Sequence, residues 1–556
     1  MAQDFPWFRH YPEHVPTQIG DPDYPSLTAL FESSAARFSE RVAYENMGVK
    51  LTFAETDRLA SAFAAYLQKK LGLRRGERIA IQMPNLLQFP IAFIGALKAG
   101  LIVVNTNPLY TPREMEHQFR DAGISALVIV ENFAANLQTI RDKVPARHII
   151  VTSMGDMLGL KGLLVNFVVR KVKKLVPAFS LPGSISFKDV LREGARLSYD
   201  PVDATLDDVA VLQYTGGTTG ISKGAQLSHR NLVCHNMMIK AWFAPYLEKK
   251  RDDLVITALP LYHIFALTVN GVLMYNSGVR NVLITNPRDI PGFIKELRKH
   301  RFTILTGVNT LFNGLMNNPD FASLDFSQLH GAVGGGMAVQ DAVAIKWQQI
   351  TGQPLVEGYG LSETSPVLCC NPLNGSQRRG TIGIPVPSTE VAIFDDDGNQ
   401  LPQGSTGEIC ARGPQVMRGY WEKDNTGVFF GDWFRTGDIG VMDEDGFFRI
   451  VDRKKDMIKV SGFNVFPNEI ENVLAGHPKV LEVAAIGIPD EKSGETIKVF
   501  IVKRDDTLSE QEVKDYCHQN LTNYKVPKFV AFKKELPKSN VGKILRRELK
   551  EAEQKK

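Results

Sequence analysis

The stretch Tyr214–His229, which reads YTGGTTGISKGAQLSH, constrains the fold more than any other part of the chain. Residues 208–214 before it alternate apolar and polar side chains as a strand does, and residues 232–242 after it place apolar side chains at helical spacing. Glycines let a backbone turn sharply and approach a ligand, while threonine hydroxyls and backbone N–H groups bind phosphate oxygens. We therefore expect a phosphate-binding loop between a strand and a helix.

This loop differs from the common ATP-binding loop in the position of its lysine. A Walker A loop needs Gly-Lys followed directly by Ser or Thr, whereas Ile221 and Ser222 here separate Gly220 from Lys223. The stretch is therefore not an ordinary P-loop, and a flexible surface loop is the alternative interpretation. The expected phosphate-binding residues are Thr215, Gly216, Gly217, Thr218, Thr219, Gly220 and Lys223.

The rest of the chain alternates helical and strand patterns. A helix is predicted over residues 27–38, a strand over 78–83, a helix over 87–98 and a strand over 101–105, and the alternation recurs through 208–360. This order is typical of an α/β protein with layered, mostly parallel sheets. A chain of 556 residues is also too long for a single core, so two or more domains are expected.

The pattern changes after residue 380 to short strands separated by Asp-Gly and Pro-Gly turns, which predicts a small β subdomain. The charged run 452–456 (DRKKD) precedes a segment with its own strands at 482–488, 497–503 and 529–532 and a helix at 509–521. Such a segment could fold alone. We predict a large domain over residues 1–452 and a small α+β domain over 453–556.

Charge and cysteine content limit the partners and the compartment. The 65 basic and 61 acidic residues leave a net charge of +4, which is too small to indicate a nucleic-acid partner. The five cysteines show no metal-binding spacing, and their odd number argues against a disulfide framework. A reducing cytoplasm fits this content best. The start of the chain lacks the pattern of a signal peptide, and no run reaches the roughly 20 apolar residues that a membrane span needs.

Residues 163–179 (LLVNFVVRKVKKLVPAF) form a basic amphipathic pattern. Such helices can lie on anionic membranes, which would place the protein on the inner face of the cytoplasmic membrane. A helix that packs on its own domain with a solvated basic face is an equal alternative, because Leu163 and Phe167 fall on the polar side. The sequence leaves both interpretations open, and it leaves a homodimer open as well.

Three further stretches carry polar groups suited to a nucleotide and its metal ion. In Gly334–Met337, the glycines Gly335 and Gly336 permit close approach to a flat ring, and in Glu357–Pro366, Tyr359 offers a face for adenine. Glu363 is an oxygen ligand suited to Mg²⁺. The missing final glycine after Gly360 and Ser362 disfavours the elbow of a serine hydrolase.

The third of these stretches is Trp433–Gly440 (WFRTGDIG), which Asp452 and Arg453 follow. A carboxylate can accept hydrogen bonds from both hydroxyls of a ribose, so Asp438 is a candidate ribose ligand. Arg453 supplies charge-assisted donors beside it. For the stretch Glu357–Pro366 taken alone, a turn in which Glu363 is an exposed carboxylate is the alternative interpretation.

Together with residues 259–268, 460–471 and 536–549, these stretches appear in the order typical of the adenylate-forming enzymes. That superfamily comprises acyl-CoA synthetases, luciferases and peptide-synthetase adenylation domains, and the chain most closely resembles the bacterial long-chain fatty acyl-CoA synthetases. The resemblance implies an acyl pocket at His263 and Phe265, although a core histidine would be the safer interpretation of His263 alone. It also implies a catalytic lysine at Lys543, a hinge at Lys455, a CoA-side face at Ser461, Gly462 and Phe463, and Mg²⁺ held by Glu363 and Thr219.

The resemblance implies that ATP and a long-chain fatty acid form acyl-AMP and pyrophosphate, and that coenzyme A then takes the acyl group. Residues 264–274 and 302–315 could line an acyl tunnel or simply form core. The alternatives are a CoA ligase for a medium-chain or aryl acid, an acyl-AMP ligase that loads a separate carrier protein, and a lipid-binding sensor without turnover. A carrier domain is not expected in the few residues after Lys543.

Overall fold

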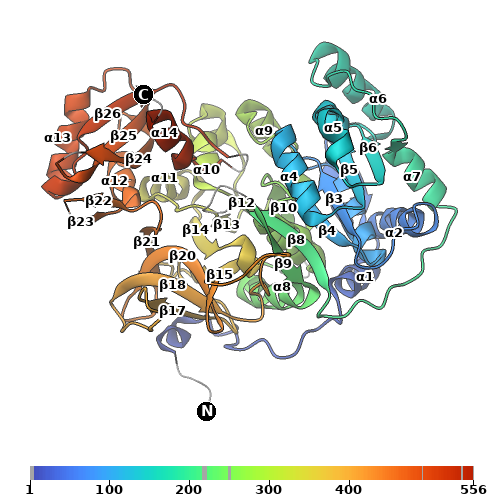
Figure 1. Ribbon diagram of the computed structural model, residues 1–556, viewed down its shortest axis with the longest axis horizontal. Helices are drawn as coiled ribbons and strands as arrows, with labels where there is room; N and C mark the ends of the chain where they lie inside the picture. Colours follow the sequence, from blue (N-terminus) through green and yellow to red (C-terminus); the bar gives the residue numbers. More distant parts are fainter. Residues whose placement is uncertain are drawn as a thin grey trace.

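The computed structural model describes residues 5–215, 222–247, 252–461, 463–490, 492–539 and 542–554. These residues form two large sheets with helices around them, a small β subdomain, and a small α+β domain that lies at one end of the molecule (Figure 1). The α/β class predicted from the sequence is confirmed. Nowhere in the described part of the chain does a helix combine the length and the apolar composition that a membrane crossing needs.

The first large sheet has the strand order β7-β6-β5-β3-β4-β8-β9. Its neighbouring strands are parallel except for the last pair, in which β8 and β9 are antiparallel. The strands are β3 (Arg78–Gln82), β4 (Ile102–Thr106), β5 (Ala126–Val130), β6 (His148–Thr152), β7 (Ile185–Ser186), β8 (Val209–Thr215) and β9 (Lys223–Ser228).

The β8–β9 hairpin corrects the predicted strand–loop–helix arrangement of the glycine-rich stretch. Lys223 does not lie in a loop that leads into a helix: it begins β9 and pairs with Thr215 at the end of β8. The helix α8 (His229–Phe243) follows only after β9, where the Ser228 side chain caps it by accepting from the Asn231 backbone N–H. The short strand was missed because small and polar residues (KGAQLS) carry little strand propensity.

The second large sheet has the order β16-β15-β14-β13-β12-β10-β11-β1-β2. Parallel strands occupy its centre, and antiparallel pairs lie at both edges. The strands are β1 (Val42–Asn46), β2 (Val49–Thr52), β10 (Leu254–Thr257), β11 (Arg280–Leu283), β12 (Ile304–Gly307), β13 (Gly331–Gly334), β14 (Val356–Gly360), β15 (Val367–Cys370) and β16 (Ile384–Pro385).

The largest hydrophobic core joins the two sheets through the helices between them. It includes side chains of both sheets, such as Ile79 and Ile304, and every residue of α3 is buried. The helices of the large domain are α1 (Leu27–Arg37), α2 (Phe53–Lys69), α3 (Gln88–Lys98), α4 (Pro112–Ala122), α5 (Ala134–Ile140), α6 (Gly159–Phe167), α7 (Phe187–Gly194), α8, the π-helix η6 (Ala266–Met274), α9 (Ile290–Leu297), α10 (Asn309–Met316) and α11 (Asp341–Thr351).

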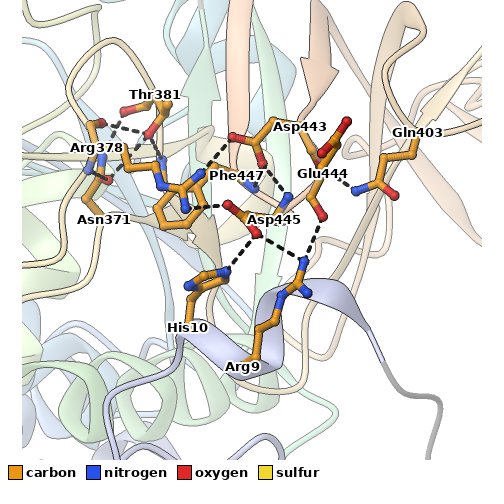
Figure 2. A network of polar contacts seen from close by, with 11 residues as sticks. Arg9, His10, Asn371, Arg378, Thr381, Gln403, Asp443, Glu444, Asp445 and Phe447 are labelled. Carbon is orange, nitrogen blue, oxygen red and sulfur yellow. Dashed lines mark hydrogen bonds and ion pairs between the residues drawn. The ribbon is translucent and has the colours of Figure 1, made fainter.

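The β subdomain packs against the start of the chain. Its sheet contains β17 (Glu390–Phe394), β18 (Thr406–Arg412), β19 (Phe429–Phe430), β20 (Trp433–Met442) and β21 (Phe448–Arg453). In the turn between β20 and β21, Asp445 accepts from Arg378 at 2.6 Å and pairs with Arg9 at 3.1 Å and with His10 at 3.4 Å (Figure 2). The Arg378 guanidinium also lies 4.0 Å from the centre of the Phe447 ring. These contacts connect residues far apart in sequence and fix the subdomain on the large domain.

The small domain begins after β21 and is built around one five-stranded sheet. Its elements are β22 (Ile458–Val460), β23 (Phe463–Val465), α12 (Pro467–Ala475), β24 (Val480–Asp490), β25 (Gly494–Lys503), α13 (Glu510–Asn520), β26 (Phe529–Lys533) and α14 (Arg546–Gln554). Arg453, which we had assigned to the small domain, is the last residue of β21 and pairs with Asp438 of β20. We propose that the segment between β21 and β22, which contains Lys455, separates the two domains.

Candidate functional site

One cavity of about 630 Å³ lies where the large domain, the β subdomain and the small domain meet. It gathers residues from six of the predicted stretches, which extend from Thr215 to Lys543 along the sequence. The predicted residues that line it are Thr215, Lys223, His263, Phe265, Gly335, Gly336, Tyr359, Gly360, Ser362, Glu363, Arg453, Lys455 and Lys543.

Some predicted residues cannot be placed in the cavity. Gly216, Gly217, Thr218, Thr219, Gly220 and Gly462 lie outside the described residues. Ser461 follows directly after β22, Phe463 begins β23, and neither residue lines the cavity. Instead, the Phe463 side chain is 57% exposed and stacks on Tyr524, with ring centroids 4.8 Å apart.

Asp438 lies at the wall of the cavity between two of its lining residues. Its carboxylate accepts a hydrogen bond from the Tyr359 hydroxyl at 2.7 Å and pairs with the Arg453 guanidinium at 3.0 Å. The β20–β21 pairing places Asp438 directly opposite Arg453, and Asp438 is only 2% exposed. Each carboxylate oxygen has a second acceptor position, so the group can still accept from the hydroxyls of a ligand.

A second buried carboxylate, Glu363, lies close to the end of β8. One of its oxygens accepts from the Tyr420 hydroxyl at 2.8 Å and from the Thr215 hydroxyl at 3.2 Å. The Lys223 ammonium lies 5.2 Å from the centre of the Tyr420 ring, within the range of a cation–π interaction. Glu363 and Lys223 thus both contact Tyr420, which places a carboxylate and a cation in the same part of the cavity.

The small domain contributes Lys543 to this cavity. The carbonyl of Gly542 accepts from the Thr310 hydroxyl at 3.0 Å, and the backbone N–H of Lys543 donates to the Ser539 hydroxyl at 3.1 Å. The nearby Arg453 guanidinium and burial together lower the pKa of Lys543 from 10.5 to about 7. The site therefore has excess positive charge that a polyanionic ligand would neutralise.

His263 and Phe265 lie at the boundary between the polar and apolar parts of the cavity. Burial, and to a smaller extent the charge of Lys543, lower the pKa of His263 to about 4. The imidazole is therefore neutral at pH 7, and it can donate one hydrogen bond to a carboxylate without adding charge. The position agrees with the binding role implied by the resemblance, and the role itself stays a proposal.

The apolar part of the cavity includes side chains of a helix that the sequence patterns do not assign to it. Ile239, Trp242 and Phe243 of α8 line this part. Of the two predicted tunnel segments, residues 264–274 contribute Ile264, Phe265 and Val269, whereas residues 302–315 contribute only Val308. Periodicity alone could not separate these positions from core, because a buried cavity wall is as apolar as a packed interior.

Four polar residues of the cavity were missed in the sequence. These four residues are Tyr420, Arg435, Lys454 and the buried Glu408 of β18, and all of them line the cavity. Glu408 accepts from Arg435 at 2.9 Å and pairs with Lys454 at 3.1 Å. The one available signal for Glu408 was a single acidic residue on the inward side of a strand pattern. Tyr420 gave the weaker signal of an aromatic residue after Arg-Gly in a loop.

The residues present fit a magnesium ion only in part. Mg²⁺ is commonly held by one or two carboxylates together with substrate phosphates. Glu363 and the Thr215 hydroxyl supply oxygen donors of this kind. In the described residues, no group of three or more His, Cys, Asp and Glu side chains forms an all-protein metal cage, so the remaining ligands would have to come from phosphates and water.

Comparisons with known proteins agree with this geometry. Residues 31–421 match the AMP-binding enzyme family, and residues 469–543 match the AMP-binding enzyme C-terminal domain. The chain belongs to the AMP-binding enzyme family. It therefore has the fold of the adenylate-forming enzymes.

Two curated relatives and one solved structure extend the comparison. The chain is 57% identical to a long-chain-fatty-acid–CoA ligase of Yersinia pestis, over 99% of this chain and 98% of the relative. It is 55% identical to a long-chain-fatty-acid–CoA ligase of Escherichia coli O6:H1, over 98% of both chains. Its fold resembles an anthranilate CoA ligase in complex with anthranoyl-AMP, with a TM-score of 0.84, 26% identity, and coverage of 96% and 98% of the two chains.

The contacts of Asp438 generate a prediction for nucleotide affinity. Asp438→Asn should weaken AMP binding at least tenfold, because one hydrogen-bond acceptor becomes a donor and Arg453 loses its counterion. Isothermal titration calorimetry with AMP measures this directly. Asp432→Asn is a matched control, since Asp432 lies in the same subdomain, is 69% exposed and pairs with Arg412 on the surface. Equal affinity of the Asp438 variant and the control would exclude Asp438 from the nucleotide site.

Proposed function

We propose that the protein ligates a long-chain fatty acid to coenzyme A, using ATP and Mg²⁺ and forming acyl-AMP as the intermediate. One observation carries the proposal. Lys543 enters a single cavity that has the Asp438–Arg453 pair on its polar side and α8 side chains on its apolar side. A hydrophobic pocket discriminates poorly between chains that differ by one methylene, so the cavity alone does not define the chain length. The names of the two bacterial relatives support a long-chain substrate.

In the first half-reaction, the substrate carboxylate attacks the α-phosphorus of ATP. A carboxylic acid with a pKa of roughly 4 to 5 is already ionised at pH 7, so this step needs no general base. Negative charge accumulates in the transition state, and Lys543, Lys223 and Thr219 would stabilise it. Bound phosphate raises the pKa of Lys543 back toward its ordinary value, because an anion favours the charged ammonium.

Glu363 and the hydroxyls of Thr215 and Thr219 would hold Mg²⁺, which supplies positive charge to the phosphates when it is bound. Glycines Gly335 and Gly336 leave room for the adenine beside Tyr359, and Asp438 would accept from the ribose. His263 would orient the carboxylate while Phe265 and α8 exclude water. Exclusion of water protects the mixed anhydride from hydrolysis.

In the second half-reaction, the small domain would rotate about Lys455. The face formed by Ser461, Gly462 and Phe463 would then replace Lys543 beside the adenylate, and the CoA thiol would displace AMP. Exposure of Phe463 away from the cavity supports a role in another arrangement of the two domains. One cavity would thus serve two reactions through a hinge.

The substrate proposal predicts a pattern of pyrophosphate release. With ATP and Mg²⁺, we expect sustained, CoA-dependent release that is fastest with palmitate or oleate, slower with octanoate and slowest with benzoate. Each acid is measured with and without CoA. Turnover with benzoate alone would overturn the fatty-acid assignment, and a single burst that is indifferent to CoA would indicate an acyl-AMP ligase instead.

The position of Lys543 predicts a division of labour between the half-reactions. Lys543→Ala should reduce adenylation, measured as pyrophosphate exchange into ATP, by at least 100-fold, a size typical of the loss of one preorganised donor. The same variant should still form palmitoyl-CoA from supplied palmitoyl-AMP and CoA. Lys538→Ala, a change at a lysine that pairs with Glu482 in the same domain, controls for general damage. Equal loss of both half-reactions would contradict this assignment.

We also propose that the protein works in the cytoplasm and binds the inner face of the membrane through α6 and the turn of π-helix η4 (Val168–Val172) that follows it. Of the twelve large apolar side chains that are exposed in the described residues, five lie in this segment and a sixth, Leu175, follows it. The five are Leu160, Leu163, Leu164, Phe167 and Val172. Lys171, Lys173 and Lys174 are exposed beside them. Apolar groups flanked by lysines suit an anionic bilayer.

Neighbouring contacts fix the orientation of this segment. Arg170 donates to both carboxylate oxygens of the buried Glu131 and to the Ser153 hydroxyl, so it is directed into the protein. The segment lies at the opposite end of the molecule from the small domain (Figure 1). Bilayer contact there would leave the small domain free to move.

The buried, unpaired state of all five cysteines supports the reducing compartment.

The membrane proposal predicts binding to vesicles of phosphatidylcholine with phosphatidylglycerol. The double variant Leu163→Glu, Phe167→Glu should lower the bound fraction at least tenfold in a sedimentation assay, since it places two charges on the apolar surface. Wild-type binding should also weaken on pure phosphatidylcholine, because each lysine near an anionic surface contributes about 1 kcal/mol. Leu109→Glu, at an exposed leucine elsewhere, is the control. Unchanged binding of the double variant would refute the proposal.

A further inference from the structure

A buried network of charges joins the two domains beside the proposed hinge, and Arg546 is its centre. Arg546 begins α14, three residues after Lys543. Its guanidinium pairs with Glu471 of α12 at 2.6 Å and donates to the Asn468 side chain at 2.5 Å. These partners belong to the small domain, so they move with Arg546 in any rotation of that domain.

The same guanidinium also reaches across to the large domain. It pairs with Asp452 of β21 at 3.2 Å, and the other oxygen of Asp452 accepts from the backbone N–H of Asn468 at 2.8 Å. Asp452 is fully buried, and Arg546 is 14% exposed as a side chain. Asp452 therefore holds two groups of the small domain, one at the start of α12 and one at the start of α14.

Other side-chain hydrogen bonds across this joint are neutral or exposed. Thr310 donates to the carbonyl of Gly542 at 3.0 Å, and Asn313 donates to the carbonyl of Leu481 at 3.3 Å. Arg288 donates to the carbonyl of Ser539 at 3.5 Å, at an exposed position. Neutral hydrogen bonds contribute less than bonds to charged groups, and the Asp452 contacts combine full charge with burial, so their loss has the larger effect.

Rotation about Lys455 would separate Asp452 from Arg546 and Asn468. Arg546 would keep Glu471, whereas Asp452 would lose both the cation and the helix N-terminus that stabilise its charge. A buried charge deprived of its partner is costly. The arrangement with Lys543 in the cavity is therefore favoured until ligands offset the loss.

We propose that Asp452 is a positioning residue that holds the small domain in the arrangement for adenylation and thereby sets the balance between the two half-reactions. This inference rests on the proposed two-step function. Asp452 acts through Arg546 and α14 on the position of Lys543, and it touches no reacting atom. Weakening the contact shifts the domain equilibrium away from adenylation.

The test is Asp452→Asn, measured in each half-reaction separately. Palmitate-dependent pyrophosphate exchange should fall at least tenfold, while palmitoyl-CoA formation from supplied palmitoyl-AMP should stay equal or rise. Glu45→Gln is the matched control, because Glu45 is a buried carboxylate that pairs with Arg280 at 3.5 Å within the large domain. Equal changes in both half-reactions, or no change in either, would overturn the proposal.

A distance measurement tests the same inference without any substrate. Cysteines introduced at the exposed Leu109 and Gln519 can be spin-labelled selectively, since all native cysteines are buried. The wild type should show one dominant distance, and Asp452→Asn should add a second population. If that variant does not fold, Arg546→Lys should produce the same broadening, because lysine cannot bridge Glu471 and Asp452. An unchanged distribution contradicts the inference even if the protein proves inactive toward fatty acids.

Discussion

The buried carboxylate of Asp438 connects the parts of this enzyme on which the site depends. The Tyr359 hydroxyl, from β14 of the second large sheet, donates to it at 2.7 Å, and Arg453, at the end of the last strand of the β subdomain, pairs with it at 3.0 Å. Because β20 and β21 set Asp438 and Arg453 opposite each other, the proposed ribose ligand and the start of the proposed hinge segment share one strand pair. Under the proposed function, a change in this pairing would disturb both nucleotide binding and domain motion.

Positive charge dominates the remainder of the cavity. Arg453, Lys455, Lys543 and Arg546 lie close enough for the other three to lower the pKa of Lys543, which is about 7. An enzyme that binds a triphosphate benefits from such crowding, since the ligand relieves a repulsion already present in the free protein. Asp452 and Glu471 offset part of that repulsion at the joint through Arg546. In the proposed function, the same charge would prepare the site for ATP and hold the small domain in place.

Local patterns predicted most of the elements, but contacts between distant residues could not be derived from them. The helix near 27–38 and the strands near 78–83 and 482–488 follow from periodicity, whereas β9 was missed because Gly224 and Ala225 do not distinguish a strand from a loop. Motif order placed Lys543, Glu363 and Tyr359 in one site before any geometry was known. Tyr420, Glu408 and the Asp452–Arg546 pair needed the fold, since their partners are tens of residues away and no local pattern encodes them.

In the proposed function, this cavity makes an acyl-adenylate and keeps it from water until a thiol arrives. Rapid-quench mass spectrometry of the protein with ATP, Mg²⁺ and palmitate, in the absence of CoA, detects such an intermediate directly. We expect palmitoyl-AMP in a stoichiometric amount with the protein, followed by its conversion to palmitoyl-CoA within one turnover of adding CoA. Formation of ADP with an acyl phosphate, or absence of any adenylate while palmitoyl-CoA still accumulates, would contradict it.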